Sequence, residues 1–491
     1  MKKSVMILFF VTLLVFFFAG CDSSEDYYGG GYLGGNYRPP PYDLGNTDEF
    51  DKITERSFVS ADQTPDSYFS LNINTASYSI IRRRINSNEK IYKDQVVIEE
   101  MLNYFKFNYP QPENGKILSI SGSFTPCPWN GNSQLLSIGI KTEEIQMSNI
   151  DNNLVFLIDV SGSMDSPDRL PLVQQAFILL AEQLNPNDRV SIVTYASGVS
   201  VKLDGAMGYD TKRICNIIED LSAGGSTSGA DGIQKAYNLA AKYFKTGGNN
   251  RVILATDGDF NVGISSQSEL EKFISNKRET GVYLSVLGFG MGNLKNNKME
   301  TLANCGNGNF AYIDTINEAR KVFIDEAGGT LKTVAKDAKA MVSFNPAYVD
   351  KYRQIGYENR QLSAGDWENE KKDAGELGAG RCITAVYEVI LKNGAELLSE
   401  TFATAAVRFK IPETEKSEEI SYNISGIASS ISDDVAFISA LVESALIMRD
   451  SIYKGEGSID AVISRLKSLN LQDEYKREFL ELMEKYKTQI Q

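Results

Sequence analysis

The sequence predicts an α/β protein built on a doubly wound, mostly parallel sheet. It also predicts two flanks, a small N-terminal α+β segment and a C-terminal domain of β-sheet and helices. Two observations support this: in the middle of the chain β-rich runs alternate with longer helical patterns, and after about residue 328 β-rich runs follow one another directly. The first order favours a parallel sheet with helices on both faces, and the second favours an antiparallel sheet. The central β-rich runs are LVFLIDV (154–160), RVSIVTYA (189–196), RVILATDG (251–258) and VYLSVLGFG (282–290).

Composition narrows the classes of function. The 491 residues are 42% hydrophobic and 23% charged, which is typical of folded protein with more than one domain. The formal net charge of −14 argues against nucleic acid as a partner, because binding to phosphates depends on Lys and Arg. The chain contains no histidine, which excludes His-dependent catalytic triads and His-ligated zinc. Any metal ion must therefore be held by oxygen or sulfur.

The cysteines do not form a metal-binding pattern. They lie far apart without a CxxC pair, which argues against a zinc site or an iron–sulfur cluster. We interpret the four outside the N-terminus as buried thiols, while disulfides among them remain an alternative. These four are Cys127, Cys215, Cys305 and Cys382.

The N-terminus has the layout of an export signal. Lys2 and Lys3 precede an apolar run over residues 5–18, and small residues lead to Cys21. The stretch FAGC resembles a bacterial lipobox, in which cleavage leaves Cys21 as the lipid-modified first residue. An ordinary secretory signal is the alternative. The Gly-, Tyr- and Pro-rich sequence that follows, to about residue 55, indicates a flexible tether.

Further elements follow from periodicity. In the N-terminal flank, a short alternating strand precedes a helix that carries Val97, Met101, Leu102 and Phe105. The C-terminal flank has half-buried strand patterns at AMVSFNP, CITAVYEVIL and TAAVRFKIP. Helices are expected at 170–184, 230–244 and 266–280 in the central unit and at 434–449 near the C-terminus.

Oxygen-bearing side chains gather where the central strands end. Asp159, Ser161 and Ser163 follow the first strand, Thr227 lies in the loop GGSTSGADG, and Asp257 ends the strand VILATDGD. Because ligands of open α/β sheets bind at the carboxyl ends of the strands, these five residues are expected to converge. All of them are hard oxygen donors, which suit Mg²⁺ or Mn²⁺. Asp165 and Asp168 are interpreted as caps of the next helix, and Asp259 as an outer partner of the site.

The motif DVSGSM, the later threonine loop and TDG resemble the metal-ion-dependent adhesion site of the von Willebrand factor type A (VWA) domain family. The resemblance implies that Asp159, Ser161, Ser163, Thr227 and Asp257 hold Mg²⁺. It also implies that an Asp or Glu of a protein partner completes the coordination. Two aspartates neutralise a divalent ion and leave it electrophilic enough for an external carboxylate.

The flanks resemble a narrower family, the YfbK-like exported VWA lipoproteins of bacteria. The resemblance rests on YFSLNINTASYSIIRRRI and VVIEEMLNYFKFNYPQP before the central domain, and on VSFNPAYVDKYRQIGYENRQL, KKDAGELGAG and SDDVAFISALVESALIMRDS after it. We therefore predict a signal peptide (1–20), a tether (21–55), an N-terminal VWA-associated domain (56–150), a VWA domain (151–327) and a family-specific C-terminal domain (328–491).

These features predict a non-enzymatic envelope protein. It would be lipid-anchored through Cys21, with the outer membrane favoured, and would face the periplasm or the cell surface. It would bind a protein partner through a Mg²⁺-bridged carboxylate. Two alternatives remain, a metal-assisted hydrolase and a scaffold that acts through its flanks.

Two stretches invite other interpretations. GFGMGN (288–293) has Asn293 where a dinucleotide-binding loop needs glycine, so we interpret it as a flexible turn. The acidic turn KKDAGE offers Asp373 or Glu376 as an internal ligand of the central metal, whereas a solvated hairpin is the simpler interpretation.

Overall fold

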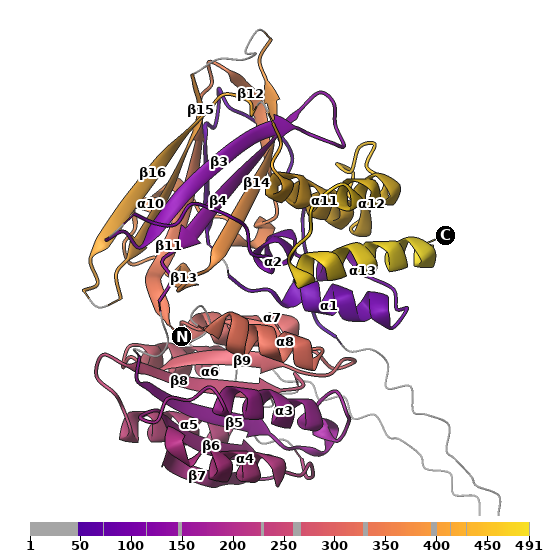
Figure 1. The fold of residues 1–491 in the computed structure, drawn as a ribbon. Coiled ribbons are helices and arrows are strands. Elements are labelled where there is room, and N and C mark those ends of the chain that lie inside the picture. Colours follow the sequence, from indigo (N-terminus) through magenta and orange to yellow (C-terminus); the bar gives the residue numbers. More distant parts are fainter. Residues whose placement is uncertain are drawn as a thin grey trace, which may run out of the picture. The chain divides into compact units, whose positions relative to one another are not determined.

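A computed structural model gives the fold of the chain (Figure 1). It describes residues 48–71, 73–113, 115–145, 150–226, 230–258, 267–327, 332–393, 400–412, 414–428 and 430–490. Within these residues, no helix combines the length and the apolar character needed to cross a membrane. The signal peptide, Cys21 and most of the tether lie outside the described residues.

The middle of the chain forms a six-stranded sheet in the order β10-β9-β8-β5-β6-β7. All neighbours are parallel except β6 and β7, so the predicted doubly wound, mostly parallel sheet is confirmed. β7 and β10 are additions at the two edges that the sequence analysis did not name. The strands are β5 (Asn152–Asp159), β6 (Arg189–Tyr195), β7 (Val199–Met207), β8 (Asn249–Thr256), β9 (Tyr283–Gly288) and β10 (Phe310–Tyr312).

Helices cover both faces of this sheet because its central strands are apolar on both sides. On β5, Leu154, Phe156 and Ile158 pack with α3, α4 and α8, whereas Val155 and Leu157 pack with α5, α6 and α7. The helices are α3 (Leu170–Ala181), α4 (Thr211–Glu219), α5 (Ala230–Lys242), α6 (Gln267–Arg278), α7 (Asn296–Cys305) and α8 (Ile316–Arg320), and α8 continues into a π-helical turn, η5 (Lys321–Asp325).

The two flanks share their β-structure. One antiparallel sheet has the order β1-β12-β14-β4-β3, and the other has the order β13-β11-β15-β16 with β2 paired to β11. Strands from before and after the central domain therefore lie side by side, although the sequence analysis assigned the flanks to separate domains. The strands are β1 (Val59–Ser60), β2 (Asp66–Ser70), β3 (Leu118–Pro126), β4 (Gln134–Thr142), β11 (Thr333–Phe344), β12 (Val349–Ile355), β13 (Gly375–Gly378), β14 (Cys382–Leu391), β15 (Thr401–Lys410) and β16 (Ser417–Ser425).

A helical layer from both flanks packs against these sheets (Figure 1). Phe105, Phe437 and Phe479 meet in its core, with ring centroids 4.9–5.8 Å apart. This core joins the N-terminal helices to the C-terminal ones. The helices are α1 (Ala76–Asn86), α2 (Ile98–Asn103), α11 (Asp433–Met448), α12 (Ile459–Lys467) and α13 (Glu474–Ile490).

A buried arginine ties the helical layer to the central domain. Arg82 of α1 donates to Asp314, which follows β10, and to Glu318 of α8 at 2.7 Å. It also pairs with Glu478 of α13 at 3.1 Å. Because Arg82, Asp314 and Glu318 are almost fully buried, each charge depends on its partners for stabilisation.

Candidate metal centre

Asp159 and Asp257 come together because they end adjacent parallel strands. β5 and β8 pair in register up to Ile158 and Ala255, so the residues that follow lie at the same edge of the sheet. Both aspartates are buried, with exposed fractions of 0% and 1%. Two buried carboxylates at one sheet edge need compensating positive charge or hydrogen bonds.

Hydrogen bonds hold the Asp159 carboxylate in place. Its Oδ1 accepts a bond of 2.9 Å from the backbone N–H of Ser161, and its Oδ2 accepts one of 3.3 Å from the hydroxyl of Thr256. Burial raises the pKa of Asp159 to about 6, and the nearby charge of Asp257 adds to the rise, although the bonds from Ser161 oppose it. Asp159 therefore favours an environment that contains a cation.

The two serines of the motif lie next to each other. The Oγ atoms of Ser161 and Ser163 are 3.1 Å apart; Ser161 is buried and Ser163 is exposed. The loop that carries Thr227 is attached to this turn, because Gly162 N–H donates to the Gly225 carbonyl at 2.9 Å and Gly224 N–H donates to the Val160 carbonyl at 2.8 Å. Thr227 and Asp259 themselves lie outside the described residues.

Arg169 is a site residue that the sequence analysis missed. Its Nη1 lies 3.0 Å from Oδ2 of Asp257 and also donates to the Ser163 carbonyl. Its Nη2 donates to the carbonyl of Met291 at 3.1 Å. The guanidinium therefore supplies positive charge at the buried carboxylate. In the sequence, Arg169 is visible only as a basic residue six positions after the second serine. Its contact with Asp257 depends on the fold.

The predicted helix caps are not formed. α3 begins after Arg169, whose side chain makes no capping bond, and Pro171 lies in its first turn. Asp168 instead accepts from the Ser166 hydroxyl at 2.6 Å and pairs with Arg83 of α1 at 2.7 Å. The interpretation of Asp165 and Asp168 as caps is therefore wrong, because α3 starts at Leu170 and the capping position falls on Arg169.

The GFGMGN segment forms a turn beside the site. Gly290 and Gly292 have φ values of 68° and 91°, which side chains rarely adopt. Asp48 anchors the turn, because its Oδ1 accepts from the N–H groups of Gly292 at 3.0 Å and Leu294 at 2.8 Å. With the bond from Arg169 to Met291, this turn connects the site to the end of the predicted tether.

Asp373 and Glu376 do not reach the predicted site. Asp373 pairs at 2.7 Å with Arg278, which ends α6 just before β9 begins, so it lies at the opposite edge of the central sheet. Glu376 belongs to β13 and is 9% exposed. The suggested internal ligand is therefore wrong, and Glu376 is not solvated either.

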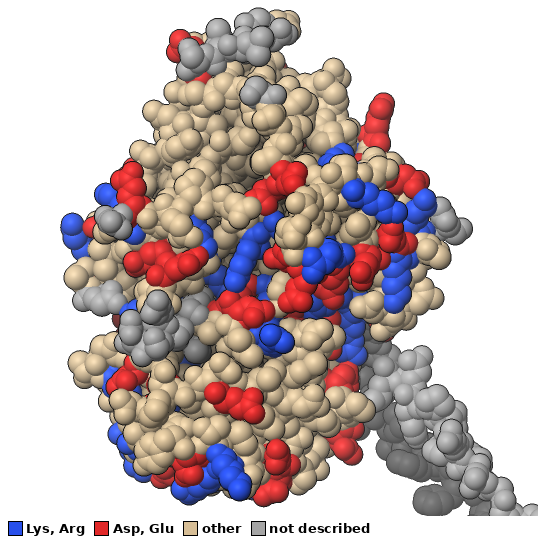
Figure 2. Space-filling model, in the orientation of Figure 1, with Lys and Arg blue, Asp and Glu red and all other residues tan. Residues whose placement is uncertain are grey.

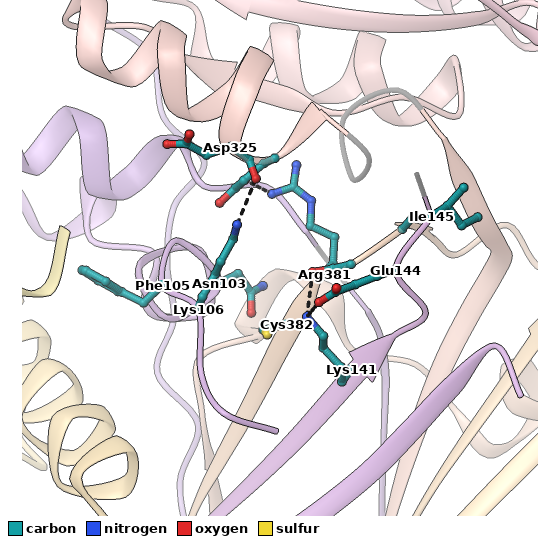
Figure 3. Close-up of a pocket in the computed structure, with 12 residues that line it drawn as sticks. Asn103, Phe105, Lys106, Lys141, Glu144, Ile145, Asp325, Arg381 and Cys382 are labelled. Atoms are coloured by element: carbon teal, nitrogen blue, oxygen red, sulfur yellow. Dashed lines mark hydrogen bonds and ion pairs between the residues drawn. The ribbon is translucent and has the colours of Figure 1, made fainter. Parts of the chain in front are cut away.

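Charges of both signs alternate on one face of the molecule. On the face shown in Figure 2, Lys and Arg are interspersed with Asp and Glu rather than gathered in a patch of one sign. A cavity of about 250 Å³ in the flanks is lined by Lys106, Lys141 and Arg381 together with acidic residues (Figure 3). Lys141 pairs with Glu144 at 3.1 Å, Arg381 pairs with Glu326, and Lys106 donates to the Asp325 carbonyl at 2.9 Å. The three basic side chains of this cavity therefore already have partners in the protein, so the described lining of the cavity offers no unpartnered basic group to a ligand.

The four cysteines that the structure describes form no disulfide. Cys127 and Cys382 are buried free thiols, as predicted, whereas Cys215 and Cys305 are half-buried free thiols. Burial raises the pKa of Cys127 to about 11, which keeps this thiol protonated at neutral pH.

The donor set at the end of β5 and β8 fits a divalent cation. It offers two carboxylates and two hydroxyls, all hard oxygen ligands. The fold and this edge of the sheet define the VWA class. The model of the von Willebrand factor type A domain matches residues 153–324, and the class commonly mediates protein–protein interaction and often binds a divalent metal.

The chain belongs to the YfbK family. It is 36% identical over 468 residues to the protein described as "Uncharacterized protein YfbK" of Escherichia coli K12, which covers 89% of this chain and 81% of that protein. The model "Uncharacterized protein YfbK, C-terminal" matches residues 329–489, and a model named "von Willebrand factor" matches residues 44–137. The resemblance found in the sequence is confirmed.

Two more distant similarities cover smaller shares of this chain. Human inter-alpha-trypsin inhibitor heavy chain H3 is 26% identical over 162 residues, which are 31% of this chain and 18% of that protein. A structure of von Willebrand factor type A from Catenulispora acidiphila has 15% identity and a TM-score of 0.41, and it covers 69% of this chain and 80% of that chain.

Proposed function

We propose that this protein is an exported, lipid-anchored VWA protein that binds a protein partner through a Mg²⁺-bridged carboxylate. The observation that carries the proposal is the pair of buried aspartates, Asp159 and Asp257, beside two hydroxyls at the carboxyl edge of the sheet. Buried carboxylates at the ends of neighbouring strands are costly unless a cation or partner compensates them.

The residues that would hold the ion are Asp159, Ser161, Ser163, Thr227 and Asp257. When bound, Mg²⁺ supplies a hard Lewis acid that accepts an external carboxylate. The chain's own residues orient this site: the Ser161 N–H fixes Asp159, and the backbone bonds from Gly162 and Gly224 hold the threonine loop against the serine turn.

A binding role is favoured over hydrolysis by the composition of the site. The chain has no histidine, and both aspartates of the candidate site are assigned to the ion. A hydrolase would need a further group to activate water or to form a covalent intermediate. Mn²⁺ would satisfy the same donor set as Mg²⁺.

The anchor is the second part of the proposal. Cys21 would carry the lipid in the bacterial envelope, with the outer membrane favoured, and the tether would let the folded part reach its partner. Metabolic labelling with a fatty acid tests this, since Cys21→Ala should abolish the label and release the chain from membranes. A label that persists in Cys21→Ala would contradict the anchor.

The binding function is tested with Mg²⁺ alone and then with envelope proteins. Calorimetry with MgCl₂ should detect one ion held by wild type and lost in Asp257→Asn, whereas the exposed control Asp220→Asn should bind like wild type. The immobilised full chain should then retain an envelope protein in Mg²⁺ but not in EDTA. Retention that is equal in Mg²⁺, in EDTA and in Asp257→Asn would overturn the proposal and point to the flanks as the binding surface.

A further inference from the structure

A second, strongly acidic cavity lies where three distant parts of the chain meet. It has a volume of about 170 Å³ and lies between the start of α2, the helix α7 and the short 3₁₀ helix η6 (Glu358–Arg360). The ionisable residues that line it are Asp51, Asp94, Glu99, Glu100, Glu300, Glu358 and Arg360. None of them belongs to the candidate metal centre described above.

Its negative charge is not balanced by the neighbouring arginines. Arg360 pairs with Glu300, and Arg449 pairs with Glu358 at 2.5 Å. Glu99 and Glu100, which are each 2% exposed, have no ion pair among the described residues. The six acidic residues of the lining therefore outnumber the two arginines, Arg360 and Arg449, by four.

Two buried oxygen atoms in this cavity also need a partner. Oε2 of Glu99 and Oδ1 of Asn296 make no hydrogen bond to any residue that the structure describes, and both side chains are more than nine-tenths buried. Glu100 is partly satisfied, because its Oε2 accepts from the Ser77 N–H at 3.0 Å. A buried polar atom without a partner is costly, so two of them in one cavity indicate a missing ligand.

The pKa values of Glu99 and Glu100 reflect their burial and the neighbouring carboxylates. Burial raises the pKa of Glu99 to about 7, and the charge of Glu358 raises it further. Burial, and then the charges of Glu300 and Glu99, also raise the pKa of Glu100 well above its ordinary value. Without a cation, the charged forms of both side chains are therefore disfavoured.

We propose that this cavity binds a calcium ion. The orphan oxygen atoms of Glu99 and Asn296, together with Glu100, offer carboxylate and amide oxygens, the ligand types that Ca²⁺ accepts. Ca²⁺ tolerates irregular sets of six to eight oxygens, which suits ligands from two separate segments, α2 and α7, better than the strict octahedron of Mg²⁺. Bound there, the ion would link the N-terminal flank to the VWA domain, beside the lining residues of η6 from the C-terminal flank.

The cavity of Figure 3 differs from the acidic cavity in its balance of charges. It is also lined by charged groups, but its lysines and arginine have partners within it. The acidic cavity differs because its charges are of one dominant sign and two of its oxygens are unsatisfied. Charge excess and orphan oxygens together, rather than polarity alone, point to a cation.

The test uses CaCl₂ and the full chain with Asp159→Asn and Asp257→Asn, which removes the carboxylates of the first centre. Equilibrium dialysis with elemental analysis should still find one calcium per chain, with an affinity of about 0.1–1 mM, as in extracellular calcium modules. Adding Glu99→Gln or Asn296→Ala should weaken this binding at least about tenfold, the effect of losing roughly 1.4 kcal/mol. The exposed control Glu279→Gln should not change it.

Folding of each variant is checked by circular dichroism, and Glu99→Gln is also made in the otherwise unchanged chain, where the calcium count should fall by one. A folded Asp159→Asn, Asp257→Asn chain that binds no calcium at concentrations about tenfold above that range would overturn the proposal. Unchanged affinity in Glu99→Gln would overturn it as well. Because the first centre is disabled in this test, the result is independent of the proposed function.

Discussion

Replacing Arg169 should strengthen metal binding at the first centre. In the present structure its guanidinium neutralises Asp257 and also donates to the carbonyls of Ser163 and Met291. A metal ion that uses Asp257 must compete with this positive charge. Arg169→Gln removes the charge but keeps an amide donor for the carbonyl groups, so it isolates the electrostatic effect.

The expected size follows from the geometry of the pair. Charges 3.0 Å apart attract by about 5 kcal/mol at an effective dielectric constant of about 20, before desolvation is subtracted. Because Asp257 is fully buried, desolvation offsets much of this attraction, and a hydrogen bond to a charged group contributes about 1.5–3 kcal/mol net. The affinity for Mg²⁺ should therefore rise by roughly 10- to 150-fold.

Titration calorimetry with MgCl₂ measures the change directly, and Arg213→Gln is the matched control because its surface pair with Asp210 lies outside the site. Thermal melts supply a second observable. In EDTA, Arg169→Gln should have a lower melting temperature than wild type because Asp257 loses its partner. Adding Mg²⁺ should remove this difference. Unchanged or weaker Mg²⁺ binding would refute the competition and would make Arg169 a residue that positions the loop.

Three further predictions concern stability. Burial and the charge of Asp337 raise the pKa of Glu376 from 4.5 to about 8, so the folded state holds a proton that the unfolded state has lost. Stability should fall as pH rises from about 4.5 to about 8, by at most about 1.4 kcal/mol per pH unit, and urea unfolding of Glu376→Gln should lack this slope. Arg82→Met should lower the free energy of unfolding by about 3–5 kcal/mol, since Asp314 and Glu318 would remain buried without a cation. Residues 332–490 produced alone should not show a folded NMR spectrum, because both of their sheets also contain strands from the N-terminal flank.

Each of these has a matched control. Glu481→Gln changes the same charge on an exposed residue and should keep the wild-type pH slope. Arg213→Met removes a surface arginine and should change stability by less than about 1 kcal/mol. Co-production of residues 48–145 should rescue folding of the C-terminal fragment if strand pairing is the reason. A well-folded isolated fragment would contradict the shared sheets.

The central domain was predictable because its signals are local. Each buried strand of the sheet is a short apolar run, and Asp159 and Asp257 directly follow two of them. The carboxyl ends of parallel strands lie at one edge of the sheet. The alternation of strand and helix patterns along the chain therefore predicted that the two aspartates lie close together. The helix ends differ from the predicted ones by a few residues, and α3 ends at Ala181 rather than at Leu184.

The partners of charged residues were not predictable in the same way. Arg169, Arg82 and Glu99 each belong to a local pattern that indicates only a loop or a helix. Their partners are Asp257, Asp314 and the lining of the acidic cavity, which lie 88 to more than 200 positions away or on other elements. Charge on a side chain does not specify which distant group will face it.

By itself the sequence determined the class of the protein, the doubly wound sheet, the order of the oxygen donors and the membership of the YfbK family, because each depends on short-range patterns or on similarity along the chain. Only the tertiary structure decided that the two flanks form common sheets, that Arg169 lies on Asp257, and that three segments enclose an excess of negative charge. Those features depend on pairings between distant residues. Burial and electrostatic interactions in the folded state stabilise such pairings, and local sequence patterns do not predict them.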